Sequence, residues 1–236
     1  MMLTPDLQRP PLSRAVAWRE VRLAVVVLWS VLGGACFFLG AQSIYDRWGT
    51  SLNATLVLDA VFLIGCLAVI GFVFWRQRRQ GEGIVELGWG RPVRMPVIVI
   101  AVVYGLAWTA MSYMRGGDPL AFPWQRPIMM AIGLVLAFAE EIAVRGLILD
   151  RLARCGTSRI IQIVVTAGIM AVYHGVVGHS VWPSYMVSSF VLFGVLSVIY
   201  VYGGRSLTPV YIAHAMAHFL GDPALMQGVL YGVGAG

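Results

Sequence analysis

Stretches of about 20 mostly apolar residues follow one another along the chain, and each is long enough to cross the hydrocarbon core of a bilayer. Fully 59% of the residues are hydrophobic and 12% are charged, with a mean hydropathy of +0.79. A soluble domain has no core large enough for so much apolar surface. We therefore expect an all-α bundle of transmembrane helices. The expected spans are Leu23–Ala41, Leu56–Trp75, Pro96–Met114, Pro127–Leu149, Ile160–Val177, Pro183–Tyr202 and the shorter Leu207–Leu220.

The arginines between these stretches predict how the helices cross the membrane. All 17 cationic residues of the chain are arginines. If the N-terminus is cytosolic, most of them fall in cytosolic segments, and those that fall outside are Arg47, Arg115 and Arg126. Membrane proteins carry such an excess of positive charge on the cytosolic side. The sequence predicts seven spans with a cytosolic N-terminus, and it leaves an eighth helix after Pro223 open.

The chain has no internal repeat and no linker that would separate two folding units. We expect a cytosolic tail at residues 1–22, N-terminal transmembrane helices at 23–126 and a catalytic transmembrane core at 127–236. The tail lacks the short apolar core of a cleaved signal peptide. The formal net charge of +6 comes from arginines dispersed between apolar stretches, so no basic face for nucleic acid is expected. The three cysteines are scattered, without the spacing of a disulfide framework or a thiolate metal site.

Two carboxylates and a guanidinium interrupt the fourth apolar stretch, at Glu140, Glu141 and Arg145. A charge at the centre of a transmembrane helix costs about 2.5 to 3.5 kcal/mol, so such a cluster indicates a function or a set of partners. Glu141 and Arg145 are four residues apart, which favours an ion pair on one helix face. Glu140 is left without a local partner and is a candidate general base or acid. The alternative is a salt-bridged network of all three charges that holds helices together.

Three of the four histidines also fall inside apolar stretches, at His174, His214 and His218, whereas His179 falls in an expected outer loop and is assigned no role. At 1.5 Å per residue from the cytosolic helix ends, Glu140 lies about 15 Å deep and His174 about 21 Å. On the same scale His214 and His218 lie about 10 and 16 Å deep. These depths overlap, so three helices are expected to bring these side chains to one chamber.

A carboxylate beside imidazoles suits hydrolysis of an amide by activated water, with N–H groups stabilising the oxyanion. Competing arrangements are weaker. Ser188 and Ser189 lie in the middle of a span, where serines more often bond the backbone or link helices. No Gly-x-Ser-x-Gly or Gly-x-Gly-Asp motif occurs. His214 and His218 do keep the spacing of a zinc-binding histidine pair, which leaves a metal-dependent mechanism open.

The order and spacing of these residues resemble those of a known family, the CPBP group of intramembrane glutamic proteases. This group includes the CAAX prenyl endopeptidases and bacterial bacteriocin-processing and immunity homologues. The likeness extends from about Phe138 to Leu220, while the earlier helices match only as generic spans. Its three motifs appear as Glu140, Glu141 and Arg145, then His174, then His214 and His218.

The resemblance implies a role for each motif residue. The first glutamate and the second-motif histidine activate water, the third-motif residues support the oxyanion, and the remaining acid and its arginine play supporting parts. The catalytic set would be Glu140, His174, His214 and His218, and the supporting set Glu141 and Arg145.

The chain departs from the family pattern at two positions. Met170 stands where an aromatic residue is usual, which affects packing. His218 stands where an asparagine is usual, within the implied oxyanion hole. A histidine can also donate a hydrogen bond to an oxyanion, so the second departure is compatible with activity.

We expect a metal-independent glutamic endopeptidase without a cofactor, acting on a membrane-associated protein or peptide within a lipid bilayer, the bacterial plasma membrane. Two alternatives stay open: a catalytically silent membrane scaffold or immunity protein, and a zinc-dependent membrane protease. A transporter fits less well, because its polar residues line a path through both leaflets and here only Asp59 adds to the cluster. Nothing in the sequence is specific for a prenyl group.

Overall fold

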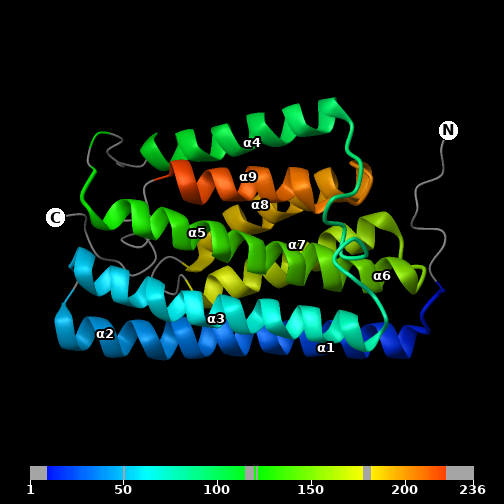
Figure 1. The fold of residues 1–236 in the computed structure, drawn as a ribbon, viewed down its shortest axis with the longest axis horizontal. Helices are drawn as coiled ribbons and strands as arrows, with labels where there is room; N and C mark the ends of the chain where they lie inside the picture. Colours follow the sequence, from blue (N-terminus) through cyan, green and yellow to red (C-terminus); the bar gives the residue numbers. More distant parts are fainter. Residues whose placement is uncertain (1–9, 50, 115–119, 121, 178–181, 222–236) are drawn as a thin grey trace.

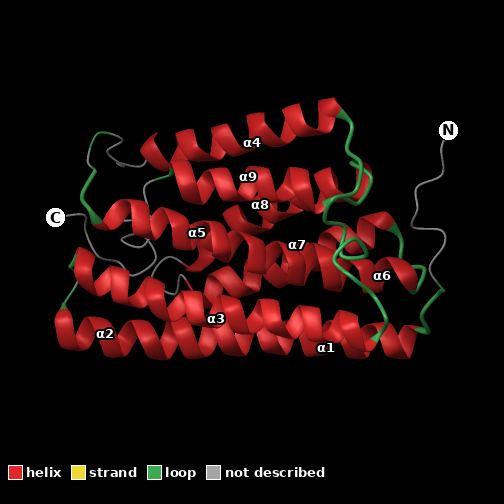
Figure 2. Cartoon of the chain, viewed as in Figure 1, coloured by secondary structure: helices red, strands yellow, loops and turns green. Residues whose placement is uncertain are grey.

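The computed structural model describes residues 10–49, 51–114, 120, 122–177 and 182–221, and within these residues the chain is helical with no strand (Figure 2). The long helices run along the length of the molecule as a bundle (Figure 1). The π-helical segments η2 and η3 continue the α-helices before them. The elements are α1 Arg14–Leu28, η2 Trp29–Gly40, α2 Ala41–Trp48, α3 Leu52–Arg79, α4 Met95–Met114, α5 Gln125–Glu141, η3 Ile142–Leu149, α6 Asp150–Arg154, α7 Arg159–Val177, α8 Trp182–Tyr202 and α9 Leu207–Leu220.

The helices begin at residues that suit a helix N-terminus. The side chains of Ser13, Ser51 and Ser206 each accept a hydrogen bond from a backbone N–H in the first turn of α1, α3 and α9. These bonds satisfy donors that the helix itself leaves free. The apolar runs that follow supply the surface that packs in the bundle or faces lipid.

Three of the described helices are long and apolar enough to cross a membrane: Leu52–Arg79, Gln125–Arg154 and Tyr185–Tyr202. Met95–Met111 and Arg159–Gly175 are shorter apolar helices. The expectation of an all-helical fold with membrane spans is confirmed, whereas the number of spans and their orientation stay predictions. The eighth helix considered after Pro223 lies outside the described residues.

The helix boundaries extend beyond the expected spans at several places. α1 begins at Arg14, nine positions before the expected start of the first span, and the helical run continues through η2 and α2 to Trp48. The expected cytosolic tail is therefore partly helical. The fourth stretch continues through η3 and α6 as one run, Gln125–Arg154. Hydropathy predicts only the part of a helix that crosses the hydrocarbon, so its polar ends are missed.

A close approach of helices places α9 next to α4 and α5. A Cβ atom added at Gly133 in α5 would lie 2.8 Å from the Cβ of His218. One added at Gly105 in α4 would lie 2.9 Å from the carbonyl oxygen of Ala213. Thr109 in α4 also donates a hydrogen bond to the carbonyl of Met216, at 3.3 Å. The two glycines thus let the helix with the histidine pair lie against both neighbours.

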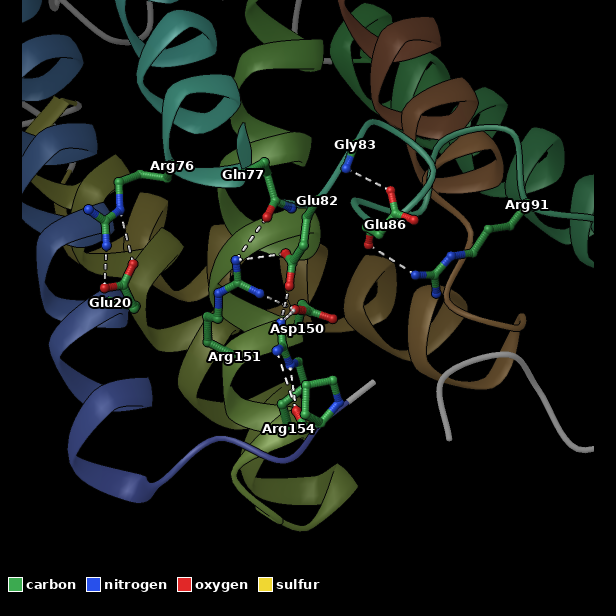
Figure 3. A network of polar contacts seen from close by, with 11 residues as sticks. Glu20, Arg76, Gln77, Glu82, Gly83, Glu86, Arg91, Asp150, Arg151 and Arg154 are labelled. Carbon is green, nitrogen blue, oxygen red and sulfur yellow. Dashed lines mark hydrogen bonds and ion pairs between the residues drawn. The ribbon is translucent and has the colours of Figure 1, made fainter. Parts of the chain in front are cut away.

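A set of ion pairs, which we call the polar network, gathers at the end of the bundle where α3 ends and α6 lies (Figures 1 and 3). Its centre is Arg151, whose side chain is 0% exposed. The guanidinium donates to Asp150 at 2.7 Å, to Gln77 of α3 at 2.8 Å and to Glu82 at 3.1 Å. Removing one partner from a buried ion pair strongly destabilises a fold, so these contacts fix α6 against α3.

Two further contacts extend the polar network toward α1. Arg154 donates to Glu82 at 2.5 Å and to the carbonyl of Pro10. Glu20 of α1 forms an ion pair with Arg76 of α3. The arginine-rich ends of α1, α3 and α6 therefore lie together at one end of the molecule (Figure 3).

The segment between α3 and α4 inserts apolar side chains into the same end of the bundle. Leu87 is 0% exposed and contacts Gly146 of η3, where an added Cβ would lie 3.1 Å from it. The ring of Trp89 packs edge-on against Phe138 and Tyr211, with centroid distances of 5.2 and 5.4 Å. This segment therefore fills the space between η3, α5 and α9.

The same segment is also bonded to the start of α9. The backbone N–H of Leu207 donates to the carbonyl of Gly88 at 2.9 Å. Gly88 has φ +101, and an added Cβ would lie 2.6 Å from the carbonyl oxygen of Arg205, so this turn requires glycine. Arg91 donates to that carbonyl at 3.3 Å and holds the turn in place.

Candidate active site

The charged cluster lies where α5 continues into η3, in the interior of the bundle. Glu140 and Glu141 are the last residues of α5, and Arg145 follows in η3. Their exposed fractions are 2%, 0% and 0%. Charged groups so deeply buried need partners, and those outside their own helix come from α8 and α9.

Glu141 is paired through one oxygen, Oε1, while its buried Oε2 has no hydrogen-bond partner among the described residues. Its Oε1 accepts a hydrogen bond from Arg145 at 3.0 Å and another from Nδ1 of His214 at 2.8 Å. The first contact is the i,i+4 ion pair that the spacing predicts. Arg145 also donates to the carbonyl of Phe193 at 2.8 Å, so the guanidinium links the end of α5 to α8.

Glu140 is the less tightly bonded of the two acids. Its Oε2 lies 3.8 Å from Nε2 of His214, beyond hydrogen-bond distance, and has no hydrogen-bond partner among the described residues. One buried carboxylate oxygen beside an imidazole is therefore available to a further donor, such as water.

The two histidines of α9 face each other. Nε2 of His218 lies 3.3 Å from Nε2 of His214. Nδ1 of His214 faces the Glu141 carboxylate and therefore carries a proton. In a neutral His214 ring Nε2 then has no proton, so the proton between the two rings belongs to His218.

His174 approaches the cluster from α7. Its Nδ1 lies 2.8 Å from the carbonyl of Met170, which accepts a bond, so Nε2 of a neutral ring is free to accept a proton. Its ring centroid lies 4.8 Å from that of Tyr173 and 4.7 Å from that of Phe193.

The structure thus brings together all six residues that the sequence singled out. Direct contacts join both acids, the arginine and the two histidines of α9, and aromatic rings connect His174 to them. His179 lies outside the described residues. Ser188 donates to the carbonyl of Tyr185 at 3.1 Å, the backbone contact expected of a serine within a span.

Three aromatic residues of the cluster were not predicted from the sequence. The indole of Trp108 in α4 stacks on His214, with centroids 5.8 Å apart and planes 8° apart. Tyr173 packs against the ring of His174, and Phe193 packs against the rings of His174 and His214. An aromatic residue in an apolar stretch gives no sign of its role, and only the position of Tyr173 next to His174 could have indicated one.

The described residues contain no group of three or more His, Cys, Asp or Glu side chains in an arrangement that could hold a metal ion. The zinc-dependent alternative is therefore left to a chelation experiment.

Residues 122–220 match a protein-family model, Rce1-like, described as type II CAAX prenyl endopeptidase Rce1-like. The matched segment begins just before α5 and ends at α9, so it contains all six of these residues. Comparisons with curated proteins and with solved structures give no match. The apolar helices and the peptidase family together identify an integral membrane protein with a protease domain. Residues 122–220 of this chain thus match an Rce1-like type II CAAX prenyl endopeptidase domain, consistent with the wider CPBP group of CAAX proteases.

Proposed function

We propose that the chain is an intramembrane glutamic endopeptidase that cleaves a membrane-associated protein or peptide with water activated by Glu140 and His174. The observation that carries the proposal is the state of the Glu140 carboxyl group. The group is buried, and its Oε2 has no hydrogen-bond partner among the described residues. This oxygen lies 3.8 Å from Nε2 of His214. A base in a site of low polarity has no competing bulk water, so its contact with one water is strengthened.

The reaction begins with proton transfer from water to Glu140, while Nε2 of His174 accepts a hydrogen bond from the same water. The hydroxide oxygen attacks the peptide carbonyl carbon, and the carbonyl oxygen becomes an oxyanion. The proton on Glu140 then passes to the leaving nitrogen as the C–N bond breaks. One water and one peptide bond give a carboxyl group and an amine.

The oxyanion is stabilised by the histidine pair of α9. The proton that joins the two Nε2 atoms at 3.3 Å is the donor. When a substrate carbonyl oxygen enters between the rings, it replaces Nε2 of His214 as the acceptor of the hydrogen bond that His218 donates. Glu141 and Arg145 support the step, because the carboxylate holds Nδ1 of His214 at 2.8 Å.

The same proposal includes the topology. We propose seven spans with a cytosolic N-terminus, N-terminal helices at 23–126, a catalytic core at 127–236, and the bacterial plasma membrane as location. The arginine-rich ends of α3 and α6 gather at one end of the bundle, which supports a common cytosolic side (Figure 3). No resident cofactor is required by the chemistry above.

The test compares the wild-type protein with Glu140→Gln in proteoliposomes. The probe is a fluorescence-quenched peptide with a farnesylated CAAX terminus, beside the same peptide without the prenyl group. Loss of a general base lowers turnover by about 10²- to 10⁴-fold, so the variant should be nearly inactive. Asp46→Asn, at an exposed acid of α2, is the matched control and keeps its activity.

Three results would count against the proposal. Equal turnover of Glu140→Gln and wild type removes Glu140 from the mechanism. Loss of turnover after treatment with 1,10-phenanthroline, restored by zinc, favours the metal-dependent protease. Cleavage of neither peptide by folded wild-type protein favours the catalytically silent scaffold.

A further inference from the structure

α8 lies within the matched segment, residues 122–220, but contributes none of the six residues that the sequence singled out. Phe193, near its middle, is 1% exposed. The centroid of its ring lies 4.7 Å from that of His174 and 5.3 Å from that of His214. One apolar side chain therefore contacts imidazoles from two different helices.

Phe193 contacts a third residue of the site as well. Cζ of Arg145 lies 5.2 Å from the centroid of its ring, within the range of a cation–π contact. Its carbonyl oxygen accepts a hydrogen bond from the same guanidinium at 2.8 Å. The ring and the backbone of a single residue thus face the arginine that pairs with Glu141.

The contacts of Phe193 fix the planes of the two imidazoles. Its ring meets that of His214 at 81°, edge to face, and that of His174 at 35°. Trp108 stacks on His214 with planes 8° apart. Two aromatic neighbours therefore restrict His214 from two directions, and aromatic pairs prefer such defined orientations.

The backbone beneath the ring is itself held in place. The carbonyl of Phe193 accepts a bond from Ser197 at 2.8 Å, and Ser197 contacts Thr166 of α7 at 3.0 Å. Tyr104 of α4 donates to the carbonyl of Leu192 at 3.1 Å. The ring therefore stands on a segment that is bonded to both neighbouring helices.

We propose that Phe193 is a positioning residue, whose ring holds the imidazoles of His174 and His214 in the orientations that hydrolysis at Glu140 requires. The inference rests on the proposed function, because it assigns Phe193 a role in the same reaction. The side chain of Phe193 has no titratable group and forms no hydrogen bond with a reacting atom. A residue that acts in this way affects the rate of the chemical step more than the binding of substrate.

The test measures kcat and KM for Phe193→Leu and Phe193→Tyr in proteoliposomes with the peptide that wild type cleaves. Leucine removes the ring and keeps an apolar side chain, whereas tyrosine keeps the ring. We expect Phe193→Leu to lower kcat about 10- to 100-fold with KM within about twofold, because a small displacement of reacting groups has effects of this size. Phe193→Tyr should keep most of the wild-type kcat, because it keeps the ring.

Two variants on the same helix are controls. Phe190→Leu makes the same change at a position that is 41% exposed, and it should leave kcat unchanged. Leu196→Ala removes a side chain that is 0% exposed, and it reports how kcat responds to loss of packing alone. Thermal unfolding of each variant gives the stability against which kcat is compared.

The inference is overturned if Phe193→Leu keeps the wild-type kcat. It is also overturned if kcat falls in Phe193→Leu, Phe193→Tyr and Leu196→Ala in proportion to their lower unfolding temperatures. These results differ from failure of the proposed function, which appears as normal turnover in Glu140→Gln whatever Phe193 does. An inactive Glu140→Gln with a normal Phe193→Leu removes only the positioning role.

Discussion

Glu141 differs from Glu140 because its Oε1 accepts two hydrogen bonds, from Arg145 and from His214. The carboxylate compensates the charge of a guanidinium that is 0% exposed. It also determines which nitrogen of His214 is protonated. Glu140 neither pairs with the arginine nor bonds Nδ1 of His214. The two adjacent glutamates of one helix therefore have different chemical surroundings.

Glu141→Gln should destabilise the protein more than Glu140→Gln. The amide removes the negative charge beside Arg145, and breaking a buried ion pair on one side costs about 3 to 5 kcal/mol. Among the described residues no arginine forms a close ion pair with Glu140, so its amide variant should unfold close to the wild type. Unfolding of both variants in mixed micelles, titrated with SDS, measures the difference.

Equal unfolding of the two variants would show that the Glu141–Arg145 pair does not stabilise the bundle. A further check is Arg145→Met in the Glu141→Gln background. The double variant has no unpaired charge at this position, so it should recover part of the stability that the single variant loses.

At the scale of the helices, two glycines determine how closely α9 lies to its neighbours. An added Cβ would lie 2.8 Å from His218 at Gly133, and 2.9 Å from the Ala213 carbonyl at Gly105. Real Cβ atoms do not make such contacts, so an alanine at either position must push α9 away. The histidine pair would move with it.

Gly133→Ala and Gly105→Ala are expected to destabilise the protein by about 1 to 3 kcal/mol, as overpacking of a core does, and to lower peptide cleavage. Gly71 in α3 and Gly168 in α7 are the matched controls, since an added Cβ meets nothing within 4 Å at either. Alanine there should be neutral or stabilise the helix by about 0.5 to 1 kcal/mol. Cleavage and unfolding of the four variants give the comparison, and similar losses in all four would contradict it.

The sequence predicted the helices and the charged cluster for physical reasons that differ. Apolar runs of sufficient length must be helical in a membrane, because the backbone has no water to bond. Glu140 and Arg145 stood out because charges are rare within such runs. The resemblance to a known family then ordered the motif residues, and the structure places these residues in one cluster.

The remaining features of the site depend on contacts between distant segments. Phe193 and Trp108 are ordinary residues for an apolar stretch, and their roles arise from which helix lies opposite. Leu87 and Trp89 belong to a loop whose path between η3 and α9 follows from the turn at Gly88 and the hydrogen bond of Arg91 to the Arg205 carbonyl. No pattern within one helix contains this information.

At the scale of the whole molecule, the proposed orientation can be measured with single cysteines in a variant that lacks the native ones. Arg78→Cys, at an exposed position of α3, should react with a membrane-impermeant maleimide only from the cytosolic side. Arg47→Cys, exposed near the end of α2, lies at the opposite end of its helical run and should react only from the outer side. Inverted and right-side-out vesicles distinguish the two.

Reaction of both cysteines from one side would contradict the proposed crossing of the first helices. Reversed accessibility of the two would contradict the cytosolic N-terminus and leave the number of spans unaffected.

The end of the bundle that holds the polar network has one more consequence for the protein in a membrane. Its cations are all arginines, since the chain has no lysine, and a guanidinium stays protonated at any physiological pH. A basic residue near an anionic lipid surface contributes about 1 kcal/mol of attraction, which dissolved salt weakens. The attraction of this end to acidic headgroups should therefore weaken as ionic strength rises.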